Sequence, residues 1–337
     1  MNRTTLTIIC VLAVLTVAVA GEMYAYIPED RGFSSEATSD GSTVSFSVSA
    51  DGAYTYRSIL FDNADMTAVS KVYIYRDRGY ASYVDDGRVI AVGAQAMTQD
   101  YYIDQLTKNL KMMGIDDITV LNASELRDTL SADLAGSAAG KGLIIASGAA
   151  PDTVFGDSDI MKDWISAGGY LYWAAGPIGR YMATPDGLVE KNLMSDLIGT
   201  DIIVEDEGRC LEDTELRPML YYNYMYSRYA PDIGTIPGRA VLGTGYADGE
   251  GHYTVTAIQC GNGQICIVAG DYNYDQLHDI AITLSSGICC KTTVVDTRER
   301  EFNRDASGTF EIATAGNLSV YISIGQYYGV YADRYDL

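Results

Sequence analysis

The sequence predicts an α/β protein with a doubly wound, mostly parallel sheet, flanked by β-strand segments from both termini. The first observation is a pair of apolar runs, residues 143–147 and 170–175, separated by an amphipathic helix at 157–167 and by Gly168-Gly169. Two buried strands joined by a crossover helix form a βαβ unit, whose strands lie in a parallel sheet covered on both faces. Second, strands and helices alternate from residue 88 onward. Third, apolar and polar residues alternate on either side of that region, which indicates antiparallel strands with one face in water.

The first 20 residues have the composition of an export signal. Arg3 supplies a positive charge, residues 6–19 are almost wholly apolar, and Ala18-Val19-Ala20 fits a small-residue cleavage site before Gly21. The apolar run is short for a bilayer span, which needs about 20 residues. We therefore expect cleavage, with an uncleaved membrane anchor through residues 4–20 as the alternative. The rest of the chain is expected to be extracellular or at the cell surface.

The remaining chain divides into four parts by its residue pattern. Residues 21–41 form a polar spacer, and residues 42–86 form a β segment in which Val44, Phe46 and Val48 share one face. Residues 87–290 form the α/β domain, and residues 291–337 form a second β segment. Because chain ends often lie close together, we hypothesise that the two β segments pair into one sheet.

Hydrophobic periodicity gives the expected order of elements within the α/β domain. Strands are expected at 88–93, 118–121, 143–147, 170–175, 240–244, 253–259 and 264–269. Helices are expected over a segment that ends at Gly114 and at 124–134, 157–167, 188–198 and 274–284. Residues 205–237 are irregular and rich in tyrosine, which indicates either an aromatic binding surface or a loop whose rings lie against the domain.

Composition limits the classes of partner. Of 337 residues, 47% are hydrophobic, which is enough to bury a large core. The 45 acidic residues outnumber the 23 basic ones and give a net charge of -22, which repels phosphate backbones and excludes nucleic acid as an expected partner. The surface is interpreted as acidic and solvated, with attraction of cations as the alternative.

Five cysteines remain after Cys10 of the leader, so the number is odd and at least one thiol has no partner within the chain. Cys260 and Cys266 flank a predicted hairpin. A three-residue loop centred on Gly263 would allow a Cys260–Cys266 disulfide, whereas a two-residue turn would point the sulfurs to opposite faces. Asn122 and Asn317 lie in Asn-x-Ser sequons and are candidate glycosylation sites.

Three segments of residues 88–290 resemble the class I glutamine-amidotransferase-like superfamily, in the branch that lacks the catalytic cysteine, such as ThuA-like and β-galactosidase-trimerisation-like domains. These segments are residues 142–148, 164–173 and 261–270. The resemblance implies a flavodoxin-like sheet. Active members carry a nucleophilic Cys after the strand matched by residues 170–175 and a His-x-Glu pair after the strand that ends here at Ala269. This chain has Trp173-Ala-Ala-Gly176 and Gly270-Asp-Tyr272 at those places, so a thiolate and its base are both missing and amidotransferase chemistry is not expected.

Polar residues that follow the expected strands are the candidate ligand site. Asp271, Asn273, Asp275 and His278 stand where a strand gives way to a helix, and open α/β sheets bind ligands at the carboxyl ends of their strands. The neighbouring strand ends contribute Ser147, Trp173 and Arg180 to the same crevice. The alternative is that residues 271–275 only turn the chain and cap the helix.

The Asp-x-Asn-x-Asp spacing at 271–275 also resembles the start of a calcium loop. Gln276 and Ile282 stand where such a loop needs Gly and a bidentate Glu, which excludes an EF-hand. No metal and no cofactor is predicted. The other histidine, His252, is interpreted as an exposed loop residue.

These observations lead to a secreted or cell-surface protein whose amidotransferase-like domain serves binding or assembly and is not expected to be an enzyme. Carbohydrate or another envelope component, including an envelope protein, is the expected partner. One alternative is a glycan-directed hydrolase that uses carboxylates such as Asp271 and Asp275. Another is a purely structural envelope protein.

Overall fold

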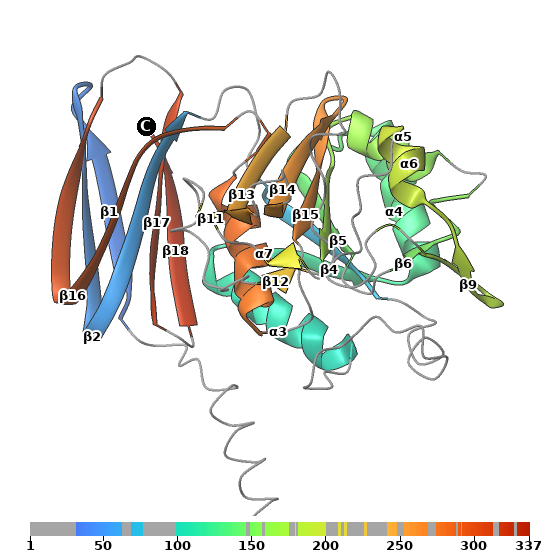
Figure 1. The fold of residues 1–337 in the computed structure, drawn as a ribbon, viewed down its shortest axis with the longest axis horizontal. Coiled ribbons are helices and arrows are strands. Elements are labelled where there is room, and N and C mark those ends of the chain that lie inside the picture. The colour runs from blue at the N-terminus through green and yellow to red at the C-terminus, as the bar shows by residue number, and fades with distance from the viewer. Residues whose placement is uncertain are drawn as a thin grey trace, which may run out of the picture.

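The computed structural model describes residues 32–62, 69–76, 99–145, 149–156, 159–174, 179, 181–199, 208–209, 212–213, 226–227, 241–247, 253–268, 274–287, 289–290, 292–312, 317–326 and 329–337. The expected leader at 1–20, the strand at 88–93 and most of the tyrosine-rich region at 205–237 lie outside these residues. No helix in the described part is both long and apolar enough to cross a bilayer. An eight-stranded sheet and a five-stranded sheet lie side by side, with helices packed between them and on the far side (Figure 1).

The eight-stranded sheet is parallel in one half and antiparallel in the other. Its order is β11-β13-β14-β15-β7-β5-β3-β4. Leu143 lies opposite Leu171 on neighbouring parallel strands, as the βαβ pattern predicts. The parallel strands are β4 (Asp117–Leu121), β3 (Lys71–Tyr75), β5 (Lys141–Ile145), β7 (Tyr170–Ala174) and β15 (Gly263–Val268). The antiparallel strands are β14 (Tyr253–Cys260), β13 (Val241–Ala247) and β11 (Glu212–Asp213).

The expected fold class, a doubly wound and mostly parallel sheet, is wrong for this chain. Most strand pairings between described residues are antiparallel, and the described part contains five helices against many more strands. The tight turn at Gly261-Asn262 joins β14 to β15 as a hairpin, which forces opposite directions. The architecture is therefore a mixed sheet beside a separate antiparallel sheet.

The five helices cover both faces of the eight-stranded sheet. One face packs against α3 and α7 through residues such as Leu106 and Leu284, and the other packs against α4, α5 and α6 through residues such as Leu130 and Trp164. The helices are α3 (Gln99–Met112), α4 (Ala123–Ala135), α5 (Ile160–Ser166), α6 (Leu193–Ile198) and α7 (Tyr274–Ser286). Short strands complete this part: β6 (Ala149–Pro151), β8 (Tyr181–Thr184), β9 (Gly187–Glu190), β10 (Gly208–Arg209) and β12 (Tyr226–Ser227).

The helix expected at 188–198 is shorter than predicted. Residues 187–190 form β9, which pairs with β8, and α6 begins only after Asn192, whose side chain accepts a hydrogen bond from the Ser195 amide at 2.9 Å. An Asn in the N-cap position stops the helix from extending backward, because its side chain replaces the missing intrahelical bond.

Strands from both ends of the chain form the five-stranded antiparallel sheet. β2 (Thr43–Asp62) pairs along its length with β16 (Thr293–Glu311), and its other edge is shared by β1 (Ser34–Ser39) and β17 (Leu318–Gln326). β18 (Gly329–Asp336) extends the sheet beyond β17. β1 lies within residues 21–41, which the sequence indicates as a polar spacer. The prediction misses this strand because its side chains are small and polar and show no apolar alternation.

A bulge lets this sheet curl around its own core. The register of β16 against β2 shifts between Asn303 and Arg304, and Arg304 has a φ of 79°. Bulges bend a strand and increase its twist. The curled inner face encloses a core that includes Phe46, Phe310 and Ile322.

The two sheets pack as one body. On the second half of β2, residues Ile59 and Phe61 face the core that α3 and α7 share with the eight-stranded sheet. Arg334 of β18 donates from Nη1 to the Ser286 carbonyl at 3.1 Å, at the C-terminal end of α7. A cation at a helix C-terminus is stabilising because the unpaired carbonyls there carry partial negative charge.

Candidate functional site

A groove of about 420 Å³ lies on the outer face of the five-stranded sheet, and three strands line it. Strand register sets the side chains in rows. Ser47 of β2 lies between Glu36 of β1 and Ser307 of β16. One row further, Ser49 lies between Ser34 and Asp305. The remaining lining residues are Ser35, Val48 and Ala306.

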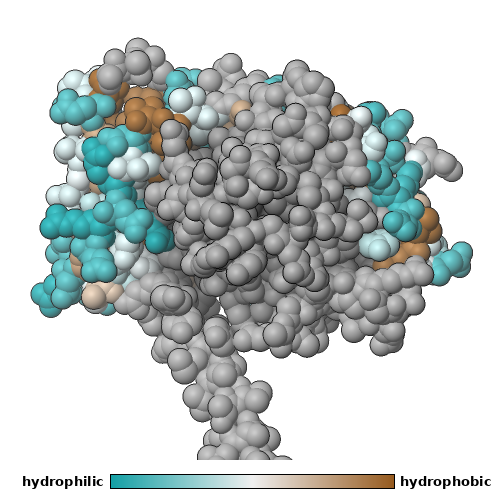
Figure 2. Space-filling view, viewed as in Figure 1, coloured by the Kyte–Doolittle hydropathy of each residue, from teal (hydrophilic) through white to brown (hydrophobic). Residues whose placement is uncertain are grey.

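Period-two alternation explains why these side chains face solvent. Val44, Phe46 and Val48 are buried in the curled core, so the serines at 45, 47 and 49 point the other way. The same alternation continues the polar face into a third row, in which Ser45 lies between Thr38 and Thr309. Figure 2 shows hydrophilic residues gathered on the side of the molecule where Figure 1 has β16 and β2.

The groove is a hydrogen-bonding surface, and its charged residues in the described part of the chain, Glu36 and Asp305, are both acidic. Serine hydroxyls both donate and accept, whereas the carboxylates of Glu36 and Asp305 only accept. Those two carboxylates stand in different rows on the two outer strands of the groove. In the part of the chain that the structure describes, no group of three or more His, Cys, Asp or Glu side chains is arranged to hold a metal ion.

A clasp of hydroxyl groups around Asp333 holds β1, one wall of the groove, against β18. The Asp333 carboxylate accepts hydrogen bonds from Ser35 Oγ at 2.9 Å and from the Tyr331 hydroxyl at 2.5 Å. The Tyr335 hydroxyl donates to the Ser35 carbonyl at 2.6 Å. Burial, together with the neighbouring Asp333 carboxylate, raises the pKa of Tyr331 above its ordinary value, so the ring keeps its donor proton.

The carboxyl edge of the parallel strands, where the sequence places a ligand site, is described only in part. Trp173 is fully buried in β7 within the core under α4, α5 and α6. Its ring centroid lies 6.5 Å from that of Phe155, and its indole nitrogen has no hydrogen-bond partner among the described residues. Asp275 and His278 lie on α7, with their side chains outside the described residues. The other predicted residues also lie outside: Ser147, Arg180, Asp271, Asn273 and the loop residue His252.

Of the two alternatives for Cys260 and Cys266, the structure shows the one without a disulfide. Cys260 pairs with Gly263 and Cys266 pairs with Ala257, so the two cysteines are not opposite each other in the hairpin. Their sulfurs point to opposite faces of the sheet: Cys260 lies in the core under α6, and its thiol is 3.8 Å from the Leu197 carbonyl oxygen, whereas Cys266 lies in the core under α3 and α7. Both cysteines are buried thiols.

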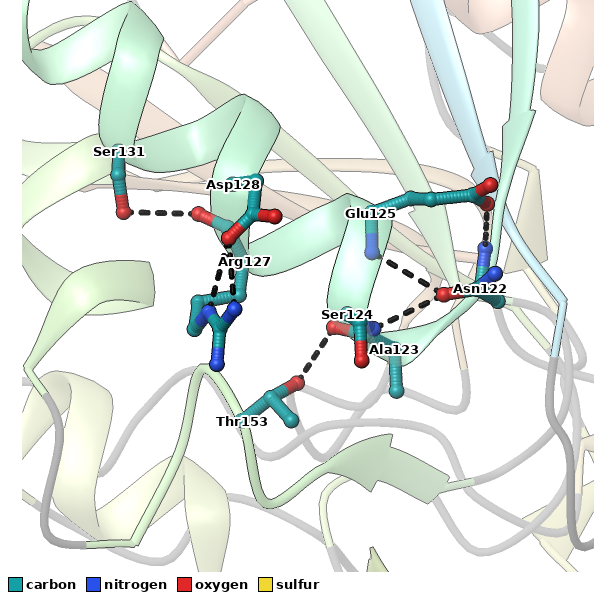
Figure 3. A network of polar contacts seen from close by, with 8 residues as sticks. All are labelled: Asn122, Ala123, Ser124, Glu125, Arg127, Asp128, Ser131 and Thr153. Atoms are coloured by element: carbon teal, nitrogen blue, oxygen red, sulfur yellow. Dashed lines mark hydrogen bonds and ion pairs between the residues drawn. The ribbon is translucent and has the colours of Figure 1, made fainter.

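Both candidate glycosylation sequons have exposed asparagines. Asn122 is also the N-cap of α4, where its Oδ1 accepts from the Ser124 and Glu125 amides at 3.0 Å (Figure 3). The Glu125 side chain accepts in return from the Asn122 amide, which completes a capping box. A glycan on Nδ2 would leave these Oδ1 contacts in place, so capping and glycosylation are compatible.

Replacing Asn122 by alanine is expected to lower the free energy of unfolding by about 1 kcal/mol, because the α4 amides lose their cap. Asn122→Asp keeps an acceptor at the cap while removing the sequon, so it is the matched control and is expected to unfold close to wild type. Urea unfolding followed by circular dichroism measures both. An alanine variant as stable as the aspartate variant would contradict the capping role.

The groove residues are the part of the candidate site that sequence reasoning missed. The alternating serines at 45, 47 and 49 are a signal for an outward polar face. Their partners in β16 are about 260 positions away in the chain, as in the pairing of Ser47 with Ser307, and only the register brings them together.

No protein-family model matches the sequence, and no curated protein does so either. Among solved structures, the chain is similar to the GH42 β-galactosidase Gan42B from G. stearothermophilus, with 18% identity and a TM-score of 0.39 over 63% of this chain and 29% of that one. A cold-adapted β-galactosidase from Rahnella sp. R3 matches with 14% identity and a TM-score of 0.39, over 81% of this chain and 42% of that one. A cytoplasmic protein of Salmonella typhimurium LT2 matches with 12% identity and a TM-score of 0.37, over 63% and 95%. The chain thus spans less than half the length of either β-galactosidase.

Proposed function

We propose that this chain is an exported, non-catalytic binding module and that its groove takes a neutral, polyhydroxylated ligand of the carbohydrate class. The observation that carries the proposal is the lining of the groove. Hydroxyls and two carboxylates surround it, and none of the described residues that line it is basic.

Sugar hydroxyls suit this lining because each of them can donate and accept. A serine hydroxyl can accept a hydrogen bond from a sugar hydroxyl or donate one to it. The carboxylates of Glu36 and Asp305 form stronger, charge-assisted hydrogen bonds with hydroxyl donors. An anionic ligand would meet these carboxylates and the net charge of -22, so phosphorylated or acidic ligands are disfavoured.

The expected affinity is weak. An exposed hydroxyl exchanges a bond with water for a bond with the ligand and contributes only about 0.5–1.5 kcal/mol. The lining residues that the structure describes also include no aromatic ring for a sugar to stack on. A handful of such contacts corresponds to binding at about the millimolar level.

Two further observations support a non-catalytic role in the amidotransferase-like branch. β5, α5, Gly168-Gly169 and β7 follow in the order that the resemblance requires, with β5 and β7 adjacent and parallel. Active members carry a nucleophilic Cys on the turn after this strand, and the sequence Trp173-Ala-Ala-Gly176 has no thiol there. The proposal of export is supported by the leader-like residues 1–20. An exported chain would have its groove outside the cell.

Removing two central hydroxyls is expected to weaken binding about tenfold. The variant is Ser47→Ala/Ser307→Ala, and each lost hydrogen bond contributes roughly 0.7 kcal/mol. Binding of neutral oligosaccharides to the full chain is measured by NMR titration, with release of reducing sugar followed in parallel. Ser131→Ala, on the exposed surface of α4, is the matched control and should bind as wild type. Absence of saccharide binding, equal binding by the double variant, or release of reducing sugar would each overturn the proposal.

A further inference from the structure

The groove on the five-stranded sheet runs across the strands. Its lining consists of three consecutive residues from each of three strands, and strand pairing places them in three rows. The middle row is the floor, in which Ser35, Val48 and Ala306 lie side by side with their side chains directed to the inner side of the sheet. The rows on either side of the floor point outward and form the two walls.

The two carboxylates of the groove stand at opposite corners. Glu36 lies on β1 in one wall, and Asp305 lies on β16 in the other. β1 and β16 pair with the same residues of β2, such as Ser47, so they lie along its two opposite edges. Both acidic side chains are exposed, and neither forms an ion pair within the described part of the chain. Each carboxylate is therefore available to a ligand.

The spacing of strands and rows sets the distance between these carboxylates. Neighbouring strands lie about 5 Å apart, and successive outward residues of one strand lie about 7 Å apart, so roughly 12 Å separates the Cα atoms of Glu36 and Asp305. Both side chains rise from the same face of the sheet and leave the carboxylates well apart. A single pyranose ring is too small to reach both of them, whereas two linked rings can reach one each.

The walls also decide how a chain-like ligand would lie. A saccharide that ran along β2 would have to cross Ser49 and then Ser47, because their side chains rise on either side of the floor. A saccharide laid across the strands meets only the floor row between the two walls, and the side chains of that row point away from it. The groove therefore favours a ligand that runs from β1 over β2 to β16.

We propose that the groove binds two linked units of a neutral, linear saccharide, with one unit on Glu36 and the next on Asp305; this rests on the proposed function. Each carboxylate accepts hydrogen bonds from the hydroxyls of its own sugar unit, and a bond to a charged acceptor contributes more than one between neutral groups. Ser47 and Ser49 stand in the middle of the two walls and face the linkage between the units. The smallest ligand that uses the whole groove is thus a disaccharide.

NMR titration of the full chain with saccharides of increasing length tests the disaccharide unit. The probes are the methyl glycosides of glucose, galactose and mannose, and the neutral di- and trisaccharides built from each of these sugars. We expect a disaccharide to bind about tenfold more tightly than its monosaccharide, because it gains a second charge-assisted hydrogen bond, and a third unit to add less than about twofold. Amide shifts are expected on both β1 and β16.

Glu36→Gln and Asp305→Asn test the two ends of the groove separately. Each substitution is expected to weaken disaccharide binding about fivefold but monosaccharide binding no more than about twofold, because a single unit can use the remaining carboxylate. Glu311→Gln removes one negative charge from the same face of β16, beyond the groove, and is the matched control. It should bind as wild type.

Different outcomes overturn the disaccharide unit and the carbohydrate site itself. If none of the saccharides binds, the proposed function fails and the disaccharide unit fails with it. Equal affinities for monosaccharides and disaccharides would overturn the disaccharide unit alone. So would substitutions of Glu36 and Asp305 that weaken both ligands by the same factor, or shifts confined to one of the two outer strands.

Discussion

Replacing Asp133 by alanine is expected to lower the free energy of unfolding by about 3–5 kcal/mol, because it leaves a partly buried ammonium without its counter-charge. Asp133 of α4 is only 6% exposed. Its carboxylate accepts from Trp164 Nε1 at 3.1 Å and from the Tyr73 hydroxyl at 3.3 Å, and it pairs with Lys141 at the start of β5. One side chain thus joins α4, α5 and two parallel strands. Burial and the Asp133 charge raise the pKa of Tyr73, so its hydroxyl stays a donor to the carboxylate.

The matched control for this experiment lies on the same helix. Asp128 is exposed and pairs with the neighbouring Arg127, and such a surface pair contributes about 0–1 kcal/mol. Asp128→Ala should therefore shift the urea midpoint little, whereas Asp133→Ala should shift it strongly at an unchanged m-value. Equal shifts for the two variants would show that the Asp133 network does not hold these elements together.

The parallel half of the large sheet could be predicted from sequence because its signals are local. The apolar runs around Leu143 and Leu171, and the Gly-Gly pair between them, lie within one 30-residue βαβ unit. Helical periodicity placed α4 and α7 to within a few residues for the same reason. In the other half, the hairpin predicted between Cys260 and Cys266 is confirmed. The mostly parallel sheet predicted for the whole domain is wrong because it leaves out the antiparallel strands that this hairpin brings in.

The groove could not be predicted because no local signal specifies register between distant strands. An outward-facing Ser47 follows from alternation alone, but its neighbours Glu36 and Ser307 follow only from pairing. A shift of one residue in β16 would turn Ser307 into the core and bring Ala306 out. The ligand site predicted at the carboxyl ends of the parallel strands follows from a general rule about such sheets and not from a pattern in these residues. Among the side chains predicted for that site, the structure describes only that of Trp173.

Replacing Gly263 by alanine is expected to destabilise the fold by about 3 kcal/mol or more, because the added methyl group has no space. A Cβ at Gly263 would lie 2.2 Å from the Gly169 carbonyl oxygen and 2.3 Å from that of Ile165. Both atoms are backbone and cannot move aside by rotating a side chain. The Asn262 amide also donates to the Ser166 carbonyl at 2.9 Å, so the β14–β15 hairpin is seated directly on the turn between α5 and β7.

Gly136→Ala is the matched control for that substitution. Gly136 follows α4 with a φ of -113° and a ψ of -92°, and among the described residues a Cβ there would meet only the Ala132 carbonyl oxygen at 3.6 Å, an ordinary contact. Its replacement should cost far less than that of Gly263, because the added methyl group has space and only the backbone conformation outside the helical region opposes it. Urea midpoints of the two variants measure the difference. Equal midpoints would mean that close packing of the β14–β15 hairpin against the α5–β7 turn does not stabilise the fold. Other contacts would then have to hold the antiparallel half of the sheet against the parallel half.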